Sequence, residues 1–251
     1  MTDAGFASNR RRLLTLGIAG LTACTTRSPK VADKPPPSKL VLAPVTPYGK
    51  VYVYLPSNPN VLFVGKTPYV IQSTQGSESA LSRKLTDLLA QQRLAAVAHL
   101  HDALMTALQQ QGSSTALPKD AVLAADAVKR WKFAALRPEA DTVLYAEVQE
   151  LSFWVLDGAR IFPLIKSTMT LISAVDDDEL GVARYSVRPD ADRSNPRALL
   201  PRAGDRFDNL DQLFADPSGA ARTLTSSLER IAQVMATDVL KVQRRETIAW
   251  D

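Results

Sequence analysis

The feature that most constrains the fold is a run of strand-like segments in the middle of the chain, joined by turn signals. Thr142–Leu156 is rich in β-branched and aromatic residues, and the Asp157-Gly158 pair after it is typical of a hairpin turn. The return segment, Arg160–Val175, alternates between a polar and an apolar face, and an acidic turn then leads to Val182–Val187. The three segments predict an antiparallel meander.

The segments around these strands have the 3.6-residue period of helices. Apolar residues recur every three to four positions from Ser79 to Gly112, which predicts a long helix in which a break stays open. A second helix is predicted over Lys119–Phe133. A third begins at Asp216-Pro217, where Asp can cap the helix and Pro suits its first position. The predicted fold class is α+β, with a mixed or antiparallel sheet packed against a long helix and a C-terminal helix.

Proline divides the region before the long helix into short pieces. Four short strands are predicted there: Lys39–Val45, Lys50–Leu55, Val61–Val64 and Tyr69–Gln72. Between the meander and the last helix, Pro189–Arg206 has no period and predicts a long loop, a type of segment that is usually functional or disordered.

The amino terminus has the pattern of an export signal. Arg10-Arg11-Arg12 precede an apolar or small stretch over residues 13–23, and Cys24 follows. As a helix this stretch would reach only ~16 Å, about half of a bilayer core, which argues against a permanent transmembrane helix.

The tetrad Leu21-Thr22-Ala23-Cys24 resembles the lipobox of bacterial lipoproteins. The resemblance implies that the Cys24 thiol receives a diacylglyceryl group, that the chain is cut between Ala23 and Cys24, and that the mature protein is held to a membrane by its acyl chains. An ordinary secretion signal with an incidental Cys24 stays the alternative. Residues 9–14 also resemble a twin-arginine signal, so the export route is open.

This interpretation divides the chain into three parts. Residues 1–23 form the signal peptide, residues 24–38 a Pro-rich tether that holds the domain ~40 Å or less from the lipid, and residues 39–251 a single periplasmic domain. By resemblance to enteric lipoproteins, Thr25 in place of Asp favours the outer membrane over the inner membrane, which stays an alternative.

The sequence offers no convincing catalytic or metal-binding constellation. The two histidines, His99 and His101, would point about 200° apart on a helix and cannot share one metal ion. There is no Gly-x-Ser-x-Gly elbow and no phosphate-binding glycine loop. The formal net charge of +4 comes without a dense basic run in the mature chain, which argues against nucleic-acid binding. We expect no enzyme activity, no cofactor and no metal; catalysis by carboxylates such as Glu147 is the minority alternative.

Four residues are candidates for contact with a partner: Arg193, Arg197 and Arg202 in the long loop, and Trp250 near the carboxyl end. Trp154 lies in an apolar strand and is expected in the core.

The order of elements loosely resembles periplasmic lipoproteins with a domain like the amino-terminal domain of TolB or the curli secretion protein CsgG, in which an Ala-Asp pair precedes an apolar strand, as Ala140-Asp141 does here. That resemblance implies a scaffold that assists the assembly of an envelope complex, with envelope proteins as partners and a homo-oligomer open. The alternative is an auxiliary lipoprotein that binds a ligand or lipid for a transporter.

Overall fold

The computed structural model describes residues 38–44, 50–55, 62–64, 67–69, 74–156, 160–246 and 248–250. The predicted signal peptide, the cleavage site at Ala23 and Cys24, the tether up to residue 37 and the turn at Asp157-Gly158 lie outside the described residues.

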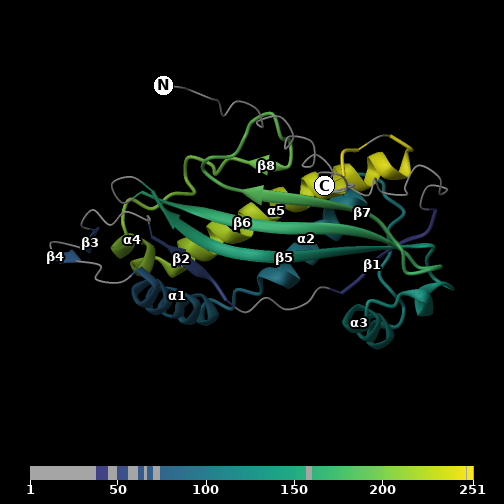
Figure 1. Cartoon of the computed structure of the whole chain (residues 1–251), viewed down its shortest axis with the longest axis horizontal. Coiled ribbons are helices and arrows are strands. Elements are labelled where there is room, and N and C mark those ends of the chain that lie inside the picture. Colours follow the sequence, from purple (N-terminus) through teal and green to yellow (C-terminus); the bar gives the residue numbers. More distant parts are fainter. Residues whose placement is uncertain are drawn as a thin grey trace, which may run out of the picture.

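Three long strands form the centre of the sheet (Figure 1): β5 (Thr142–Val155), β6 (Ile161–Ser173) and β7 (Glu179–Val187). They pair antiparallel in that order, with Met169 of β6 between Ala146 of β5 and Ala183 of β7. The predicted meander is therefore confirmed.

Short parallel strands complete the sheet and make it mixed. β1 (Leu40–Leu42) and β2 (Tyr52–Tyr54) both run parallel to β5 and pair with its beginning and its end, respectively. On the other side β8 (Ala198–Leu199), within the predicted loop, pairs with β7. A separate hairpin consists of β3 (Leu62–Val64) and β4 (Thr67–Tyr69), so the last of the four short strands begins before the predicted position.

The segment predicted as one long helix is broken into two helices, which was the alternative left open above. α1 (Thr74–Gln91) ends and α2 (Ala96–Gln110) begins on either side of Arg93, whose φ of 53° cannot continue a right-handed helix. α3 (Ala121–Arg130) is followed by a short 3₁₀ turn, η2 (Ala134–Leu136). The short helix α4 (Leu210–Ala215), which the sequence did not predict, precedes α5 (Pro217–Gln243).

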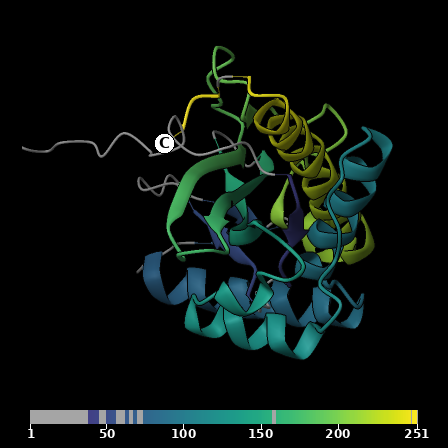
Figure 2. The ribbon, with the colours of Figure 1, turned by 90° about the vertical axis from the view of Figure 1, so that its right-hand side faces the viewer.

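α5 begins where the sequence predicted. The Asp216 carboxylate accepts a hydrogen bond of 2.7 Å from the Gly219 backbone N–H, which satisfies one of the free donors of the first turn. α5 then lies beside α2 on one face of the sheet (Figure 2). The fold class is α+β with a C-terminal helix packed on a mixed sheet, as predicted.

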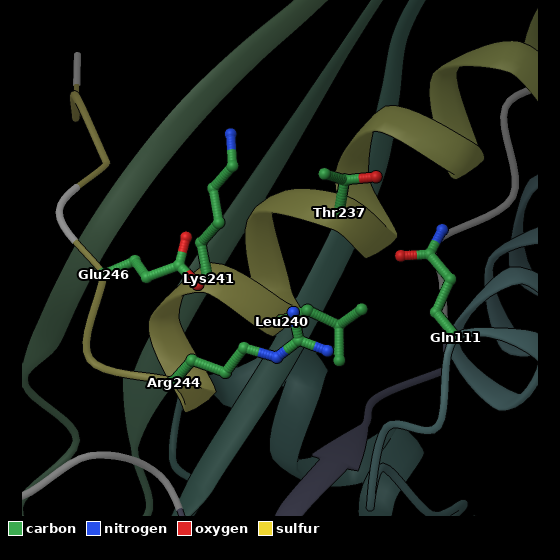
Figure 3. A pocket seen from close by; sticks show the side chains of 6 residues that line it. All are labelled: Gln111, Thr237, Leu240, Lys241, Arg244 and Glu246. Atoms are coloured by element: carbon green, nitrogen blue, oxygen red, sulfur yellow. The ribbon is translucent and has the colours of Figure 1, made fainter.

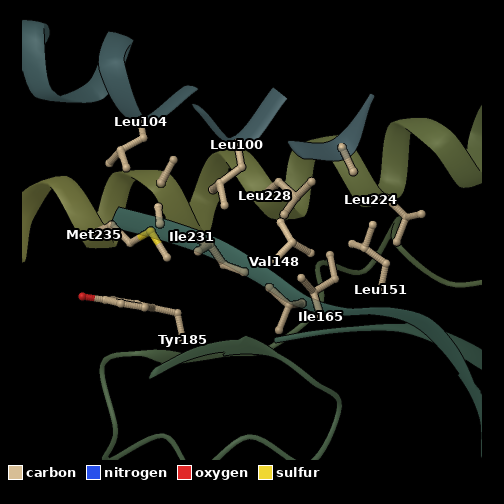
Figure 4. Close-up of a cluster of buried hydrophobic side chains, with 14 of the residues drawn as sticks. Leu100, Leu104, Val148, Leu151, Ile165, Tyr185, Leu224, Leu228, Ile231 and Met235 are labelled. Carbon is tan, nitrogen blue, oxygen red and sulfur yellow. The ribbon is translucent and has the colours of Figure 1, made fainter. Parts of the chain in front are cut away.

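The main core fills the layer between these helices and the sheet (Figure 4). Leu100 and Leu104 of α2 meet Leu228 and Ile231 of α5 above Ile165 of β6, and each of these side chains is fully buried. At ~1.5–3 kcal/mol for each large apolar side chain, this layer is the main source of stability.

A β-bulge in β5 decides which residues face this core. The register shifts between Val148 and Glu150, so the even-numbered residues before the bulge and the odd-numbered ones after it face the helices. Phe153 is consequently buried, and Trp154 points to the opposite face of the sheet.

The opposite face of the sheet is covered at one end by α3 and η2. A second cluster of buried residues joins Ala124 and Val128 of α3 and Leu136 of η2 to Val143 and Ile172 of the sheet. At the other end of this face the aromatic side chains are only partly buried, and this is the end where the candidate site lies.

Candidate functional site

An aromatic patch occupies the half-buried end of the outer sheet face. In the strand register Tyr54 of β2, Trp154 of β5 and Phe162 of β6 form one row, and Tyr52, Ser152 and Leu164 form the next. We define the aromatic patch as Tyr52, Tyr54, Trp154, Phe162 and Leu164, all of intermediate exposure. The rings of Tyr52 and Tyr54 stack with their centroids 6.1 Å apart and an interplanar angle of 17°.

The expectation that Trp154 lies in the core is wrong, and the bulge is the reason. Alternation counted from the start of β5 cannot reveal an extra residue, and one extra residue exchanges the two faces beyond it. The sequence signal that could have identified the patch is the period-2 spacing of Tyr52 and Tyr54, which places both rings on one face of a strand whose middle residue, Val53, is buried.

A pocket of about 200 Å³ opens beside the patch. It is lined by Tyr54, Trp154, Leu164, Lys166, Arg188 and Asp190.

The charges at this pocket are paired within the chain. Lys166 Nζ lies 2.7 Å from Glu150 Oε2. Arg188 donates two hydrogen bonds of 2.7 Å to the Asp190 carboxylate, which keep the pKa of Asp190 below its ordinary value and raise the pKa of Arg188. The site therefore presents aromatic surface with neutralised charges at its rim, which suits an apolar or aromatic segment of another molecule.

The hydroxyl of Ser152, on the same face of β5 as the patch, is engaged within the chain. Ser152 is fully buried, and its Oγ donates to the Leu164 carbonyl at 3.0 Å and lies 3.1 Å from Glu150 Oε1. Glu147, the carboxylate of the minority alternative, lies on the same face of β5 and pairs across the sheet with Thr168.

Arg197, a predicted partner contact, is instead buried inside the protein. Its Nε donates to Asp238 Oδ2 of α5 at 2.7 Å, and the same oxygen accepts the Tyr185 hydroxyl at 2.9 Å. The Nη1 group of Arg197 donates a hydrogen bond to the carbonyl of Ala249. Arg197 is 8% exposed, and these hydrogen bonds hold the long loop, β7 and α5 together. Because its guanidinium is bound within the chain, Arg197 is not a free contact group.

Trp250, another predicted contact, packs on the protein itself. Its indole lies against Gly181 of β7, where a Cβ would come within 2.6 Å of the ring, and it is half-buried on the main core. Arg193 and Arg202 are exposed in the loop and stay predicted partner contacts. The structure thus brings Arg197 and Trp250 together at the carboxyl-terminal segment and brings none of the four candidates into the aromatic patch.

The two histidines do not converge. His99 Nε2 lies 3.0 Å from Glu229 on α5, whereas His101 Nδ1 lies 3.6 Å from Asp102 on its own helix. Within the described part of the chain, no group of three or more His, Cys, Asp or Glu side chains could hold a metal ion. No helix in that part is long and apolar enough to cross a membrane.

A second pocket, of about 360 Å³, lies between the ends of α2 and α5 (Figure 3). Gln111 stands on one side and Lys241 and Glu246 on the other, with Leu240 and Arg244 between them. Lys241 Nζ also lies 3.7 Å from Oδ1 of the buried Asp238, which partly neutralises the positive charge of the lysine. Unlike the pocket beside the aromatic patch, this one has no aromatic side chain among its lining residues.

Comparisons with known proteins identify no family for the chain. No family model and no curated protein matches the chain. Among solved structures, the protein XCC0632 from Xanthomonas campestris, of the family DUF330, is 10% identical with a TM-score of 0.40 over 82% of this chain and 86% of its own. The lipoprotein GNA1162 from Neisseria meningitidis is 12% identical with a TM-score of 0.27 over 59% and 79%, respectively.

A third structure, the hypothetical protein CT253 from Chlamydia trachomatis, is 11% identical with a TM-score of 0.31 over 80% of this chain and 97% of its own. With TM-scores below 0.5, these similarities assign the chain to no family.

Proposed function

We propose that the protein is a non-enzymatic lipoprotein of the bacterial cell envelope that helps to assemble a secretion or transport complex. Its membrane anchor is the lipidated Cys24, and its partner surface is the aromatic patch. The observation that carries the anchor is the position of Cys24, directly after a basic and then apolar leader. The localisation proposed is the outer membrane, with the folded domain in the periplasm.

The shape of the patch supports a protein partner over a small ligand. Binding sites for small molecules usually have volumes of ~300–1,000 Å³, whereas the pocket beside the patch has about 200 Å³. Aromatic residues are enriched where proteins bind one another, and a core of aromatic side chains with a polar rim is typical of such interfaces. The Lys166–Glu150 and Arg188–Asp190 pairs would supply that rim.

The packed core argues against the transporter alternative. A protein that carries a lipid between its helices and its sheet needs an apolar cavity in that layer. Here Leu100, Leu228 and Ile165 are fully buried and occupy the layer (Figure 4). The described residues therefore favour the assembly role.

Mass spectrometry of the mature amino terminus tests the anchor. The chain isolated from membranes should begin at Cys24 and carry a diacylglyceryl group. The Cys24→Ser variant should leave the membrane fraction. A mature chain that begins at another residue, or that stays in the soluble fraction, would overturn the proposal.

Site-specific photo-cross-linking in cells tests the patch. A photoreactive phenylalanine analogue at Phe162 should form a discrete adduct with an envelope protein, and the adduct should disappear when Trp154→Ser removes the neighbouring ring. The same analogue at Thr237, exposed on α5, is the matched control and should form no such adduct. Absence of any protein adduct at position 162 would contradict a partner surface at this place.

A further inference from the structure

Exposed apolar side chains gather at one end of the molecule. Among the residues that the structure describes, five large hydrophobic side chains are strongly exposed, at 37–76%. They are Leu117, Val122, Leu123, Trp131 and Val175, and we call them the apolar end. All lie on or beside α3 or in the turn between β6 and β7, at the end of the sheet opposite the aromatic patch (Figure 1).

Hydrogen bonds hold these segments together as one surface. Asp177, in the β6–β7 turn, accepts hydrogen bonds from the backbone N–H groups of Phe133 and Ala134, just after Trp131. Arg137 Nε donates to the Ala174 carbonyl at 3.1 Å, next to Val175. The segment that precedes Leu117 pairs with β1 through two backbone hydrogen bonds of Ala116, at 2.8 and 2.9 Å.

Trp131 is held outward at some conformational cost. It ends α3 with a φ of 49°, a left-handed conformation that is rare for a bulky residue. Its ring makes an edge contact with Tyr145, the centroids lying 5.1 Å apart, and the side chain is still 52% exposed. This left-handed C-cap ends the helix and fixes the direction in which the half-exposed indole leaves α3.

The chain from Cys24 arrives at this same end. The Asp141 carboxylate accepts hydrogen bonds from the Ser38 hydroxyl at 2.6 Å and from the Lys39 backbone N–H at 3.1 Å, and the Asp141 carbonyl binds the N–H of Ala174. Only residues 25–37 separate Cys24 from Ser38. A fully extended chain of this length spans at most ~50 Å, so an anchor at Cys24 keeps the apolar end, where the described chain begins, within ~50 Å of the lipid.

Exposed cations surround the apolar end. Lys129, Arg130 and Lys132 flank Trp131, and the Asp126 carboxylate of α3 lies 3.9 Å from Lys129 Nζ and 3.4 Å from Arg130 Nη2, which partly offsets their charge. Arg244 and Arg245 follow Gln243, which binds Ser113 and Ser114 near Leu117. Long basic side chains beside a tryptophan suit the boundary between headgroups and acyl chains, because their stems stay in apolar surroundings while their charges reach the phosphates. The acidic turn beside Val175 opposes this attraction, and its Asp177 carboxylate is directed inward to the backbone of Phe133.

From these observations we propose that the apolar end docks on the lipid surface, with Val122 and Trp131 at the level of the headgroups. This inference rests on the proposed anchor at Cys24. The domain then stands with its long strands away from the membrane and the aromatic patch at its distal end.

Fluorescence quenching in vesicles tests this orientation. The mature lipidated protein carrying Val122→Cys is labelled with an environment-sensitive fluorophore and reconstituted into vesicles of phosphatidylethanolamine and phosphatidylglycerol. The acylated Cys24 has no free thiol, so the label is unique. We expect blue-shifted emission, several-fold quenching by lipids with nitroxide-labelled acyl chains, and weaker quenching when Trp131→Asn removes the indole.

The matched control is Ala215→Cys, exposed at the end of α4 at the opposite end of the molecule, where the label should stay unquenched. Protein that floats with the vesicles while the label at position 122 stays unquenched would overturn the orientation and leave the anchor intact. Protein that does not float would refute the anchor, and the orientation with it. A blue shift at position 122 that needs no vesicles and grows with protein concentration would overturn it in favour of a second copy as occupant.

Discussion

Asp238 carries the most consequential charge among the described residues, because it is buried on the apolar side of α5. At 6% exposure it accepts hydrogen bonds from Arg197 and Tyr185, and Arg197 is itself 8% exposed. Removing one charge of a buried pair costs far more than the pair itself contributes, since the remaining charge is left without a partner. This cluster joins three elements that are distant in the sequence.

Asp238→Asn should therefore lower the free energy of unfolding by about 3 kcal/mol, because the Arg197 guanidinium stays buried without its counter-charge. Denaturant titration measures the difference. Asp190→Asn breaks the exposed pair with Arg188 and is the matched control, with a loss of ~1 kcal/mol or less. Equal losses in the two variants would show that the Arg197–Asp238 pair is not buried in solution.

Asp190 should titrate below an ordinary aspartate, because its ionised form accepts two hydrogen bonds from Arg188. Its pKa is lowered by folding, so the stability it contributes is present above the pKa of the unfolded chain and is lost as the pH falls through the lower folded value. NMR titration of the carboxyl carbon measures this pKa. In Arg188→Gln it should return toward the ordinary value; no change would exclude the pair as the cause.

At the scale of single residues, the sequence shows the chemical type of a side chain but not whether that side chain is buried or exposed. Arg197 and Trp250 were expected to contact a partner because both lie in segments without a period, and such segments carry no information about burial. One signal was present: Asp238 interrupts the apolar stripe of α5 between Met235 and Val239, and a charge on a buried stripe needs a counter-charge. Lys241 is nearer in the sequence and lies 3.7 Å from Asp238, whereas the buried partner, Arg197, is 41 positions away and could not be identified from the sequence.

Among elements, those with a long uniform period were predicted and those fixed by tertiary contacts were not. The meander and α5 follow from alternation and from the Asp216-Pro217 start. α4 and β8 were not predicted, and β2, predicted within Lys50–Leu55, is fixed by α1, where Thr86 Oγ1 accepts the Val51 N–H at 3.0 Å and Ser82 Oγ accepts the Val53 N–H at 2.9 Å. The bulge could not be predicted, because one extra residue hardly changes the composition of a strand. The aromatic patch could not be predicted either, because the bulge decides which residues of β5 face outward.

The carboxyl-terminal segment is attached to β7 through Gly181. Gly181→Ala should displace the Trp250 ring, since the new Cβ would overlap it, and should lower the free energy of unfolding by about 1–3 kcal/mol. Differential scanning fluorimetry and tryptophan emission measure both effects. Gly204→Ala is the control, because a Cβ there meets nothing within 4 Å. If Gly181→Ala costs as much in a Trp250→Ala background, the indole does not occupy this place.

The packing of α5 on the sheet can be tested in the same way. Ile231→Ala should lower the free energy of unfolding by about 2–5 kcal/mol, since it leaves a cavity in the fully buried layer between α5 and β6. Gln233→Ala, two positions on and exposed, should change it by less than about 0.5 kcal/mol. Urea titration compares them; a small loss for Ile231→Ala would mean that the layer is loosely packed.

For the whole molecule, the long strands separate the two proposed surfaces. Ser152, which lies in the row of the patch residues Tyr52 and Leu164, is ten positions along β5 from Thr142, which corresponds to ~33 Å at the rise of a strand. In the proposed orientation, the length of the sheet would therefore set the distance between the bilayer and a partner bound at the patch. The sequence predicted the long strands of this sheet, but not which exposed side chains gather at its two ends.

Loss of the anchor should consequently affect assembly and leave folding unchanged. Cys24→Ser should keep the thermal unfolding midpoint of the domain, because Cys24 lies outside the segments that form the core. It should also abolish the cross-link from position 162, since the patch is no longer held at its height above the membrane. Persistence of the cross-link in Cys24→Ser would show that the partner recognises the domain without attachment.

The extra residue in β5 has a consequence for how this chain can vary. Removing Gln149 alone would close the bulge, because Val148 and Glu150 already pair with the consecutive residues Ser167 and Lys166, so Phe153 would stay inward and Trp154 outward. Removing one further residue would exchange the two faces, so natural variants that are shorter at this point should lack only a single residue.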